Sequence, residues 1–173
     1  MSTHLDRRDL LKLLSATALA MPLQLKAAGI DKLYFTADEF ALLDVLTEHI
    51  IPRDKHSPGA HDAEVAAYID RAVAESFLPE EKQSWNKGLA EIDRLSIEIH
   101  KRPFLKTSKS EQVALLKKLA EPDDDSKTDG EKFFQKLKSA AVFGYYTTSI
   151  GIHQDIEYQG NIIQEQFAGY DAV

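Results

Sequence analysis

The chain has 173 residues, enough for one domain with a short appendage, and it contains no cysteine. The absence of cysteine excludes disulfides, thiolate metal sites, iron–sulfur ligation and covalent c-type haem attachment. Residues 1–28 hold four basic and two acidic residues, so they carry +2, and the other 145 residues carry −9 (17 basic against 26 acidic). An acidic body argues against nucleic-acid binding, which needs a basic surface.

The N-terminal residues 1–28 have the composition of an export signal. A polar, basic start is followed by the run 13–25, which is apolar except for three polar residues and is shorter than the ~20 apolar residues of a membrane-spanning helix. The start resembles the twin-arginine motif, which directs folded proteins across the bacterial inner membrane. The motif residues are Arg7, Arg8, Leu10, Leu11 and Lys12. We therefore expect a periplasmic protein, free or associated with the inner membrane; the alternative is an amphipathic helix with two solvated arginines.

The first two helices of the body are predicted from caps and periodicity. Thr36 and Glu39 have the spacing of a capping box, and Pro52 ends the helix that follows. Residues 52–61 form a loop with a turn at Pro58-Gly59. Asp62 is expected to cap a second helix that runs to about Ser76. Its buried face would hold Val65, Tyr68, Ile69, Ala72 and Val73.

Three further helices are predicted towards the C-terminus. Pro79 suits the first position of a helix that ends near Arg102, before Pro103. Ser108 and Glu111 form a second capping box for a helix to about Ala120. Asp129 is expected to cap a long last helix, and from Thr147 the chain becomes irregular. Residues 34–173 are thus predicted to be a single all-α domain of about five helices with an aromatic-rich tail.

The body carries no motif for catalysis. The glycines lack the G-x-G-x-x-G spacing of a dinucleotide site, and no G-x-S-x-G elbow is present. The best metal candidate is a cluster around the first loop, although its spacing is not that of a standard site. The members of this cluster are His49, Asp54, His56, His61 and Asp62. We therefore interpret them as a solvated loop with incidental histidines and keep the metal site as the alternative.

Aromatic residues are concentrated near the C-terminus. Phe133, Phe134, Phe143, Tyr145, Tyr146 and Tyr158 fall in one stretch, and Phe167 and Tyr170 follow. Aromatic residues at helical spacing usually face a core, but they are also enriched in the buried centres of protein interfaces. We expect both here, with Phe133, Leu137 and Ala140 facing inward and the tyrosine pair and the tail facing outward.

Two groups of residues resemble a known family. Ile50-Ile51-Pro52 with Pro58-Gly59-Ala60, and Gly144-Tyr145-Tyr146-Thr147 with Tyr158-x-Gly160-Asn161, are similar to subunit 3 (the small, or gamma, subunit) of gluconate 2-dehydrogenase and related sugar dehydrogenases. The resemblance extends over roughly residues 34–171.

The resemblance implies a heteromeric enzyme. This chain would bind neither cofactor nor metal, and its large partner would be an FAD-containing flavoprotein of the glucose–methanol–choline type, with a cytochrome c as electron acceptor. The small subunit would carry the twin-arginine signal for both chains, which accounts for a folded-export signal on a chain without a cofactor motif.

Two further predictions concern the partner interface and the alternative functions. The partner interface is expected at Pro52, Pro58, Gly59, Tyr145, Tyr146, Tyr158, Asn161, Phe167 and Tyr170. The alternatives are a transient export chaperone for the flavoprotein and an independent periplasmic metal enzyme that uses His49, His56 and His61.

Overall fold

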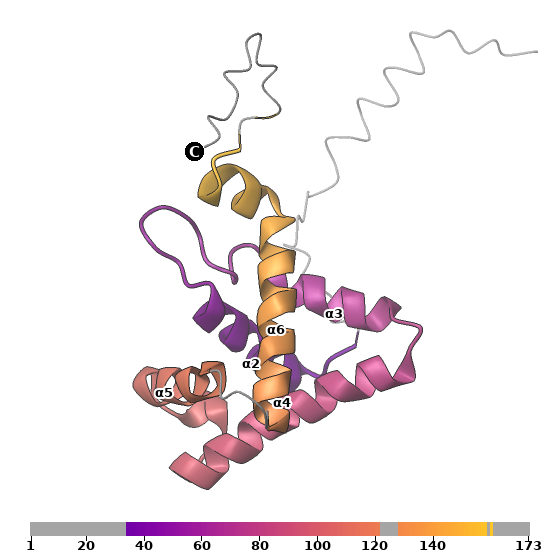
Figure 1. The fold of residues 1–173 in the computed structure, drawn as a ribbon, viewed down its shortest axis with the longest axis vertical. Coiled ribbons are helices and arrows are strands. Elements are labelled where there is room, and N and C mark those ends of the chain that lie inside the picture. Colours follow the sequence, from indigo (N-terminus) through magenta and orange to yellow (C-terminus); the bar gives the residue numbers. More distant parts are fainter. Residues whose placement is uncertain (1–33, 122–127, 159, 161–173) are drawn as a thin grey trace, which may run out of the picture. The chain divides into compact units, whose positions relative to one another are not determined.

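The computed structural model describes residues 34–121, 128–158 and 160. In this part of the chain the predicted all-α fold class is confirmed, since it consists of helices and connecting loops without a strand (Figure 1). The elements are α2 (Ala37–Ile50), α3 (Val65–Glu75), α4 (Pro79–His100), the 3-10 turn η1 (Phe104–Lys106), α5 (Lys109–Ala120), α6 (Asp129–Tyr146) and the π-helical turn η2 (Gly151–Asp155). The predicted signal segment, and Asn161, Phe167 and Tyr170 in the tail, lie outside the described residues. Within the described residues, none of the helices has the length and apolarity needed to cross a membrane.

Capping boxes start three of the helices. The boxes predicted at Thr36–Glu39 and Ser108–Glu111 are confirmed, with the Glu carboxylates accepting from the cap amides at 2.9 and 2.7 Å. The predicted cap of α6 is wrong by one residue, because Thr128 is the cap and Asp129 is the first helical residue. Thr128 has Glu131 three positions later, so the pair satisfies two amides reciprocally.

The predicted start of α3 is also wrong. Asp62 does not cap the helix, because its carboxylate accepts a hydrogen bond from Arg53 Nε at 3.0 Å. Residues 60–64 instead form successive turns, and the helix begins at Val65 after Glu64, whose φ is 55°. Of the five residues expected on its buried face, Tyr68 and Ala72 are exposed.

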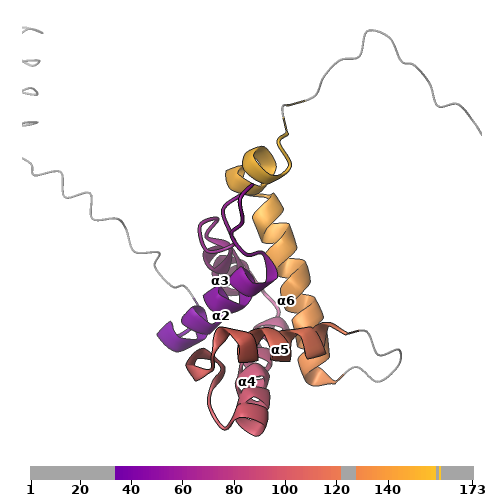
Figure 2. The same cartoon turned by 90° about the vertical axis from the view of Figure 1, so that its left-hand side faces the viewer.

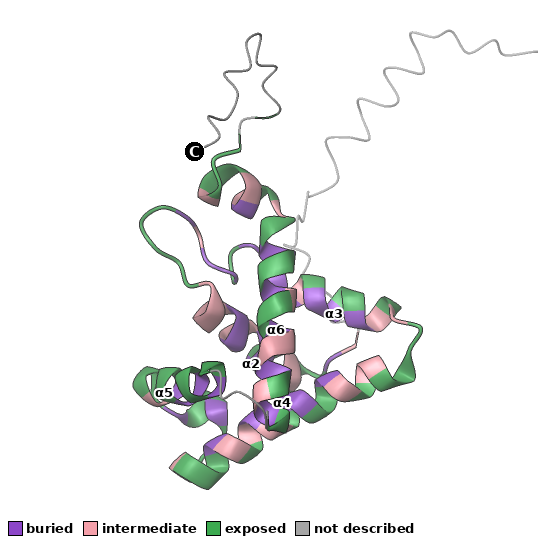
Figure 3. Cartoon of the chain, viewed as in Figure 1, coloured by how far each residue is buried: buried purple, intermediate pink, exposed green. Residues whose placement is uncertain are grey.

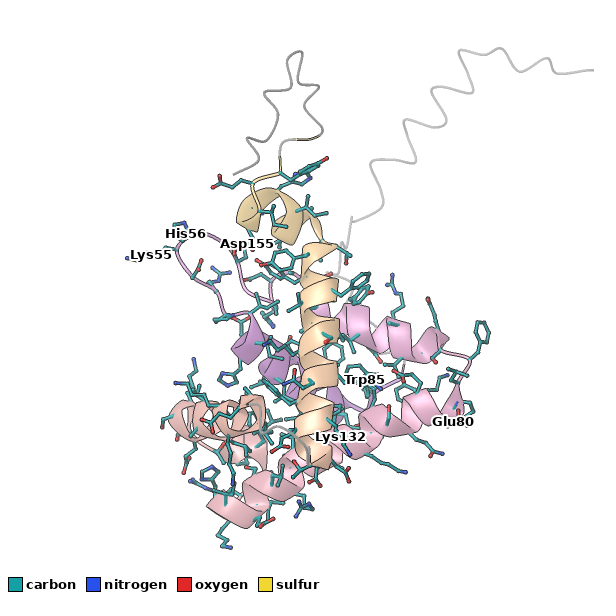
Figure 4. The ribbon with its side chains drawn as sticks, viewed as in Figure 1. Lys55, His56, Glu80, Trp85, Lys132 and Asp155 are labelled. Atoms are coloured by element: carbon teal, nitrogen blue, oxygen red, sulfur yellow. The ribbon has the colours of Figure 1, made fainter. Side chains whose placement is uncertain are left out.

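Helix α6 packs against α2, α3, α4 and α5, and Figures 1 and 2 show it running past all four. Leu137 and Ala141 on α6 are fully buried. Gly88 permits a close approach of α4 to α6, because a Cβ there would lie 1.9 Å from the Phe133 ring. Trp85 lies between α4 and α6 (Figure 4), with its ring edge-on to Phe133 at a centroid distance of 5.7 Å.

A buried carboxylate fixes the start of the described fold. Asp70 on α3 is 1% exposed, and one of its oxygens accepts hydrogen bonds from the amides of Tyr34 and Phe35 at 2.8 and 3.0 Å. Phe35 in turn packs edge-on against Trp85. The segment before α2 is therefore held to both α3 and α4.

Candidate partner interface

The α2–α3 loop, residues 51–64, is folded around the side chain of Glu48. One carboxylate oxygen of Glu48 accepts from the amide of Arg53 at 3.0 Å, and the other accepts from the amide of His61 at 2.9 Å. Gly59 lies directly against this carboxylate, since a Cβ at Gly59 would be 2.4 and 2.5 Å from its oxygens. Gly59 is buried, so its place in the loop is structural and it offers no side chain to a partner.

A second carboxylate orders the tip of the same loop. Asp54 Oδ1 accepts from the amides of Ser57 and His56 at 2.9 and 2.7 Å, and these hydrogen bonds lower the pKa of Asp54 below its ordinary value. Lys55 and His56 point outward at the tip (Figure 4). Of the predicted interface residues here, Pro52 is exposed and Pro58 is partly exposed. The tip is thus a preorganised surface.

The expectation that both Tyr145 and Tyr146 face outward is wrong for Tyr145. Its side chain is 0% exposed, and its hydroxyl donates to the carbonyl oxygen of Pro58 at 2.6 Å. The hydroxyl also lies 2.9 Å from Ser57 Oγ, and Ser57 Oγ donates to Asp155 Oδ1 at 3.1 Å. Tyr145 therefore joins α6 to the α2–α3 loop, and its buried ring cannot contact a partner in this conformation.

Tyr146, by contrast, remains 39% exposed. Its ring packs edge-on against Tyr145 at 5.2 Å, and its hydroxyl is hydrogen-bonded to Asp155. That hydrogen bond, together with partial burial, raises the pKa of Tyr146. The Asp155 carboxylate thus accepts hydrogen bonds from Ser57 and from Tyr146. These bonds hold η2 to the α2–α3 loop and to the end of α6, and Figure 4 shows Asp155 at this junction.

An exposed aromatic surface continues from Tyr146 along α6 and onto α3. We call Tyr68, Val142, Phe143 and Tyr146 the α6 patch; their exposed fractions are 37, 38, 62 and 39%. The rings of Tyr68 and Phe143 lie 6.2 Å apart, and Tyr68 packs over Gly144, where a Cβ would be 2.7 Å from its ring. Three patch residues on α6 also line a surface hollow of about 610 Å³.

Further apolar side chains follow α6. Ile156 is 57% exposed and Tyr158 is 46% exposed, both just after η2. Of these exposed residues, the sequence predicted Tyr146 and Tyr158 as interface residues but not Tyr68, Val142 or Phe143. Tyr68 falls on the apolar stripe of α3, so helical periodicity predicts that it is buried. In the structure its ring lies over Gly144 of α6, at the edge of the core, and remains partly exposed.

The histidines of the metal hypothesis are held apart by separate partners. His49 Nε2 lies 2.8 Å from Gln112 Oε1, and His61 Nδ1 lies 2.8 Å from Asp44 Oδ2. His56 points outward at the loop tip (Figure 4). Within residues 34–121 and 128–158, no group of three or more His, Asp or Glu side chains is arranged to hold a metal ion. The Asp44 carboxylate raises the pKa of His61.

The chain matches a known protein family. The family model described as Gluconate 2-dehydrogenase subunit 3 matches residues 37–161. The matched range begins at the first residue of α2 and contains every described helix, including all of α6. No curated protein and no solved structure matches the chain.

Proposed function

The chain belongs to the gluconate 2-dehydrogenase subunit 3 family, and from this premise we propose that it is the permanent, non-catalytic small subunit of a sugar or polyol dehydrogenase complex. Membership implies a partner dehydrogenase subunit. In the proposal, that partner is an FAD-containing flavoprotein of the glucose–methanol–choline type, and it oxidises a sugar hydroxyl and passes electrons to a cytochrome c. This chain would bind and stabilise the flavoprotein.

The observation that carries the binding role is the α6 patch. It consists of three aromatic side chains and one valine, all on the outside of helices whose opposite faces form the core. Aromatic side chains fixed on rigid helices suit a permanent interface, because little conformational entropy is lost when they are buried. The α2–α3 loop, whose polar groups are already hydrogen-bonded within the chain, adds a second preorganised surface at Pro52.

The export role follows from residues 1–28. The motif around Arg7 and Arg8 resembles a signal for translocation of folded proteins, and a flavoprotein must fold around FAD before export. We propose that the small subunit binds the folded flavoprotein in the cytoplasm and takes it through the twin-arginine translocase. Both chains would then reside in the periplasm, where they would stay associated.

The test is purification of the full chain, tagged at its C-terminus through a flexible linker, from the periplasm and membranes of its host. An equimolar larger chain with a flavin absorption spectrum would support the proposal. A larger chain bound in the cytoplasm but absent in the periplasm would replace the permanent subunit with a transient export chaperone. A lone colourless chain would overturn both, and an equimolar tightly bound metal on it would favour an independent metal enzyme.

A further inference from the structure

The connection between α3 and α4 presents the most exposed large apolar side chain among those the structure describes. Phe77 is 99% exposed and the adjacent Leu78 is 63% exposed. We call these two residues the α3–α4 corner. In Figure 1 the connection projects at the right-hand edge, and Figure 3 shows it coloured as exposed. A Phe ring with almost no contact to its own chain contributes nothing to the core. Core packing therefore does not explain why a large apolar side chain stands at this position.

The corner is a fixed turn. The amide of Ser76 donates to the carbonyl oxygen of Val73 at 3.2 Å, and the amide of Leu78 donates to Ser76 Oγ at 3.3 Å. The carbonyl oxygen of Leu78 then accepts from the amide of Glu81 at 3.1 Å, with Pro79 at the first position of α4. The backbone on both sides of Phe77 is thus hydrogen-bonded, so the ring is presented outward by an ordered turn.

Acidic side chains flank this apolar tip. Glu75 and Glu80 are both exposed, and neither forms an ion pair within the described part of the chain. Figure 4 shows Glu80 at the corner. Lys82, two residues after Glu80, is turned inward, where its ammonium donates to the carbonyl oxygen of Ala74 at 2.9 Å and lies over the Tyr34 ring. The exposed Arg71 lies one helical turn before Glu75. The corner therefore combines an apolar tip with carboxylates at its sides.

We propose that the α3–α4 corner inserts Phe77 and Leu78 into an apolar pocket on the partner dehydrogenase subunit, and that Lys or Arg side chains edge this pocket. The inference rests on the proposed function and adds to it a second point of contact. A buried aromatic residue surrounded by complementary charges is the usual form of an interface hot spot. The carboxylates argue against a membrane surface, which is anionic and attracts basic segments.

The position of the corner fits a partner that also covers the α6 patch. Tyr68 of the patch lies on α3, and Phe77 follows the end of the same helix, nine residues later. At the rise of an α-helix, Tyr68 and the last helical residue, Glu75, are roughly 10 Å apart along the axis, and Phe77 follows two residues later. Between them Ala72 and Glu75 are exposed as well. One partner surface that runs along the outer face of α3 would bury both points.

The experiment uses the full chain and its co-purifying flavoprotein. Phe77→Ser should lower the affinity for the flavoprotein by roughly tenfold or more, the range of a hot-spot residue. Phe77→Leu, which keeps an apolar side chain at the corner, should retain most of the affinity for the flavoprotein. The matched control is Ile99→Ser in the last turn of α4, where the side chain is 46% exposed and lies outside both proposed contacts. Because Phe77 has almost no contacts within the chain, its replacement should leave the unfolding midpoint unchanged.

A photo-crosslinking phenylalanine analogue at position 77 identifies the contact directly. The proposal expects a crosslink to the flavin-containing chain at a peptide with apolar and basic residues, and none from the same analogue at position 99. A flavoprotein that co-purifies equally with wild type and Phe77→Ser, without a crosslink, would overturn the inference and leave the proposed function intact. If wild type retains no flavoprotein, the proposed function itself fails. A crosslink to lipid or to a second copy of this chain would overturn the inference in favour of those contacts.

Discussion

The hydroxyl of Tyr145 and the carbonyl oxygen of Pro58 are 2.6 Å apart, although 87 residues separate them in the sequence. This hydrogen bond ties the last turn of α6 to the α2–α3 loop, and Ser57 extends it to η2. The two sequence groups that carry the family resemblance, around Pro58 and around Tyr145, thus meet in the fold. Because the contact between the two groups is buried, it cannot touch a partner directly, but it fixes the conformation of the adjacent α2–α3 loop and of the end of α6.

Tyr145→Ala should destabilise the chain strongly. Removing a fully buried aromatic ring costs about 3–5 kcal/mol in free energy of unfolding, through lost burial and the cavity left behind. Tyr145→Phe should cost about 1–2 kcal/mol, because it keeps the ring and leaves the Pro58 carbonyl without this donor. Urea unfolding monitored by circular dichroism measures both. Equal stability of Tyr145→Ala and wild type would show that the ring is not part of the core.

Phe143→Ser should weaken the complex without unfolding the small subunit. The Phe143 side chain is 62% exposed, so its replacement should change the free energy of unfolding by less than about 1 kcal/mol. Its removal from the α6 patch should lower the amount of flavoprotein that co-purifies. Val113→Ser on α5 is the control, since Val113 is 38% exposed and lies outside the patch. Equal co-purification by the two variants would exclude the patch as the interface.

Gly88→Ala should lower stability, which is opposite in sign to its effect on helix propensity. Propensity alone favours Ala over Gly inside a helix by about 1 kcal/mol. The new Cβ would, however, lie 1.9 Å from the Phe133 ring, and such overpacking typically costs about 1–3 kcal/mol. Thermal unfolding of Gly88→Ala is compared with that of Ala90→Gly at an exposed position of the same helix. The second variant reports the effect of helix propensity alone, so the comparison separates propensity from overpacking. A higher midpoint for Gly88→Ala would mean that α4 and α6 are less closely packed.

The pair of His61 and Asp44 should make a small, pH-dependent contribution to stability. Asp44 raises the folded-state pKa of His61 above its ordinary value near 6.5. The contribution is therefore complete below the ordinary pKa and is lost as the pH rises through the raised folded-state pKa. Because both side chains are partly exposed, it should stay below about 1 kcal/mol. Unfolding of wild type and His61→Gln should differ at pH 5.5 and converge at pH 8.5, and a difference that grows with pH would contradict this.

Replacing Arg7 and Arg8 together by Lys should hold the chain in the cytoplasm. Lysine keeps the charge but lacks the planar guanidinium, so the change tests the motif and not the charge of residues 1–28. Under the proposed function, the flavoprotein should be retained as well. Cell fractionation and immunoblotting measure both chains, with Lys26→Gln as a control outside the motif. Normal export of the double variant would exclude the twin-arginine route.

Local signals in the sequence predicted most helix boundaries. The Thr36 and Ser108 boxes and the start of α4 at Pro79 depend on residues within one turn, so they could be recognised without tertiary information. Asp62 was misassigned because its partner, Arg53, lies nine residues away in a loop. The α6 start was off by one residue because Thr128 and Asp129 are both good caps, and only the reciprocal bond with Glu131 decides between them.

The candidate interface was less predictable. Tyr145 and Tyr146 are adjacent and chemically alike, yet the α2–α3 loop covers the first and leaves the second partly exposed. Periodicity along α6 contains no information about that loop. Phe77 was not singled out either, because exposure at a corner depends on how two helices meet and not on the residues around it.

The Asp70 hydrogen bonds limit where the chain can be processed. Because the amides of Tyr34 and Phe35 are already engaged by a buried carboxylate, a mature protein must retain its peptide chain from at least Tyr34 onward. A signal removed after Ala28 would leave five residues, Gly29 to Leu33, ahead of the first engaged amide. Five extended residues reach at most about 18 Å, so a peptidase would have to act almost against the folded domain. Since the proposed export route delivers a chain that is already folded, a signal peptidase would have to cut beside this bonded segment, and N-terminal sequencing of the periplasmic chain should find its first residue before Tyr34.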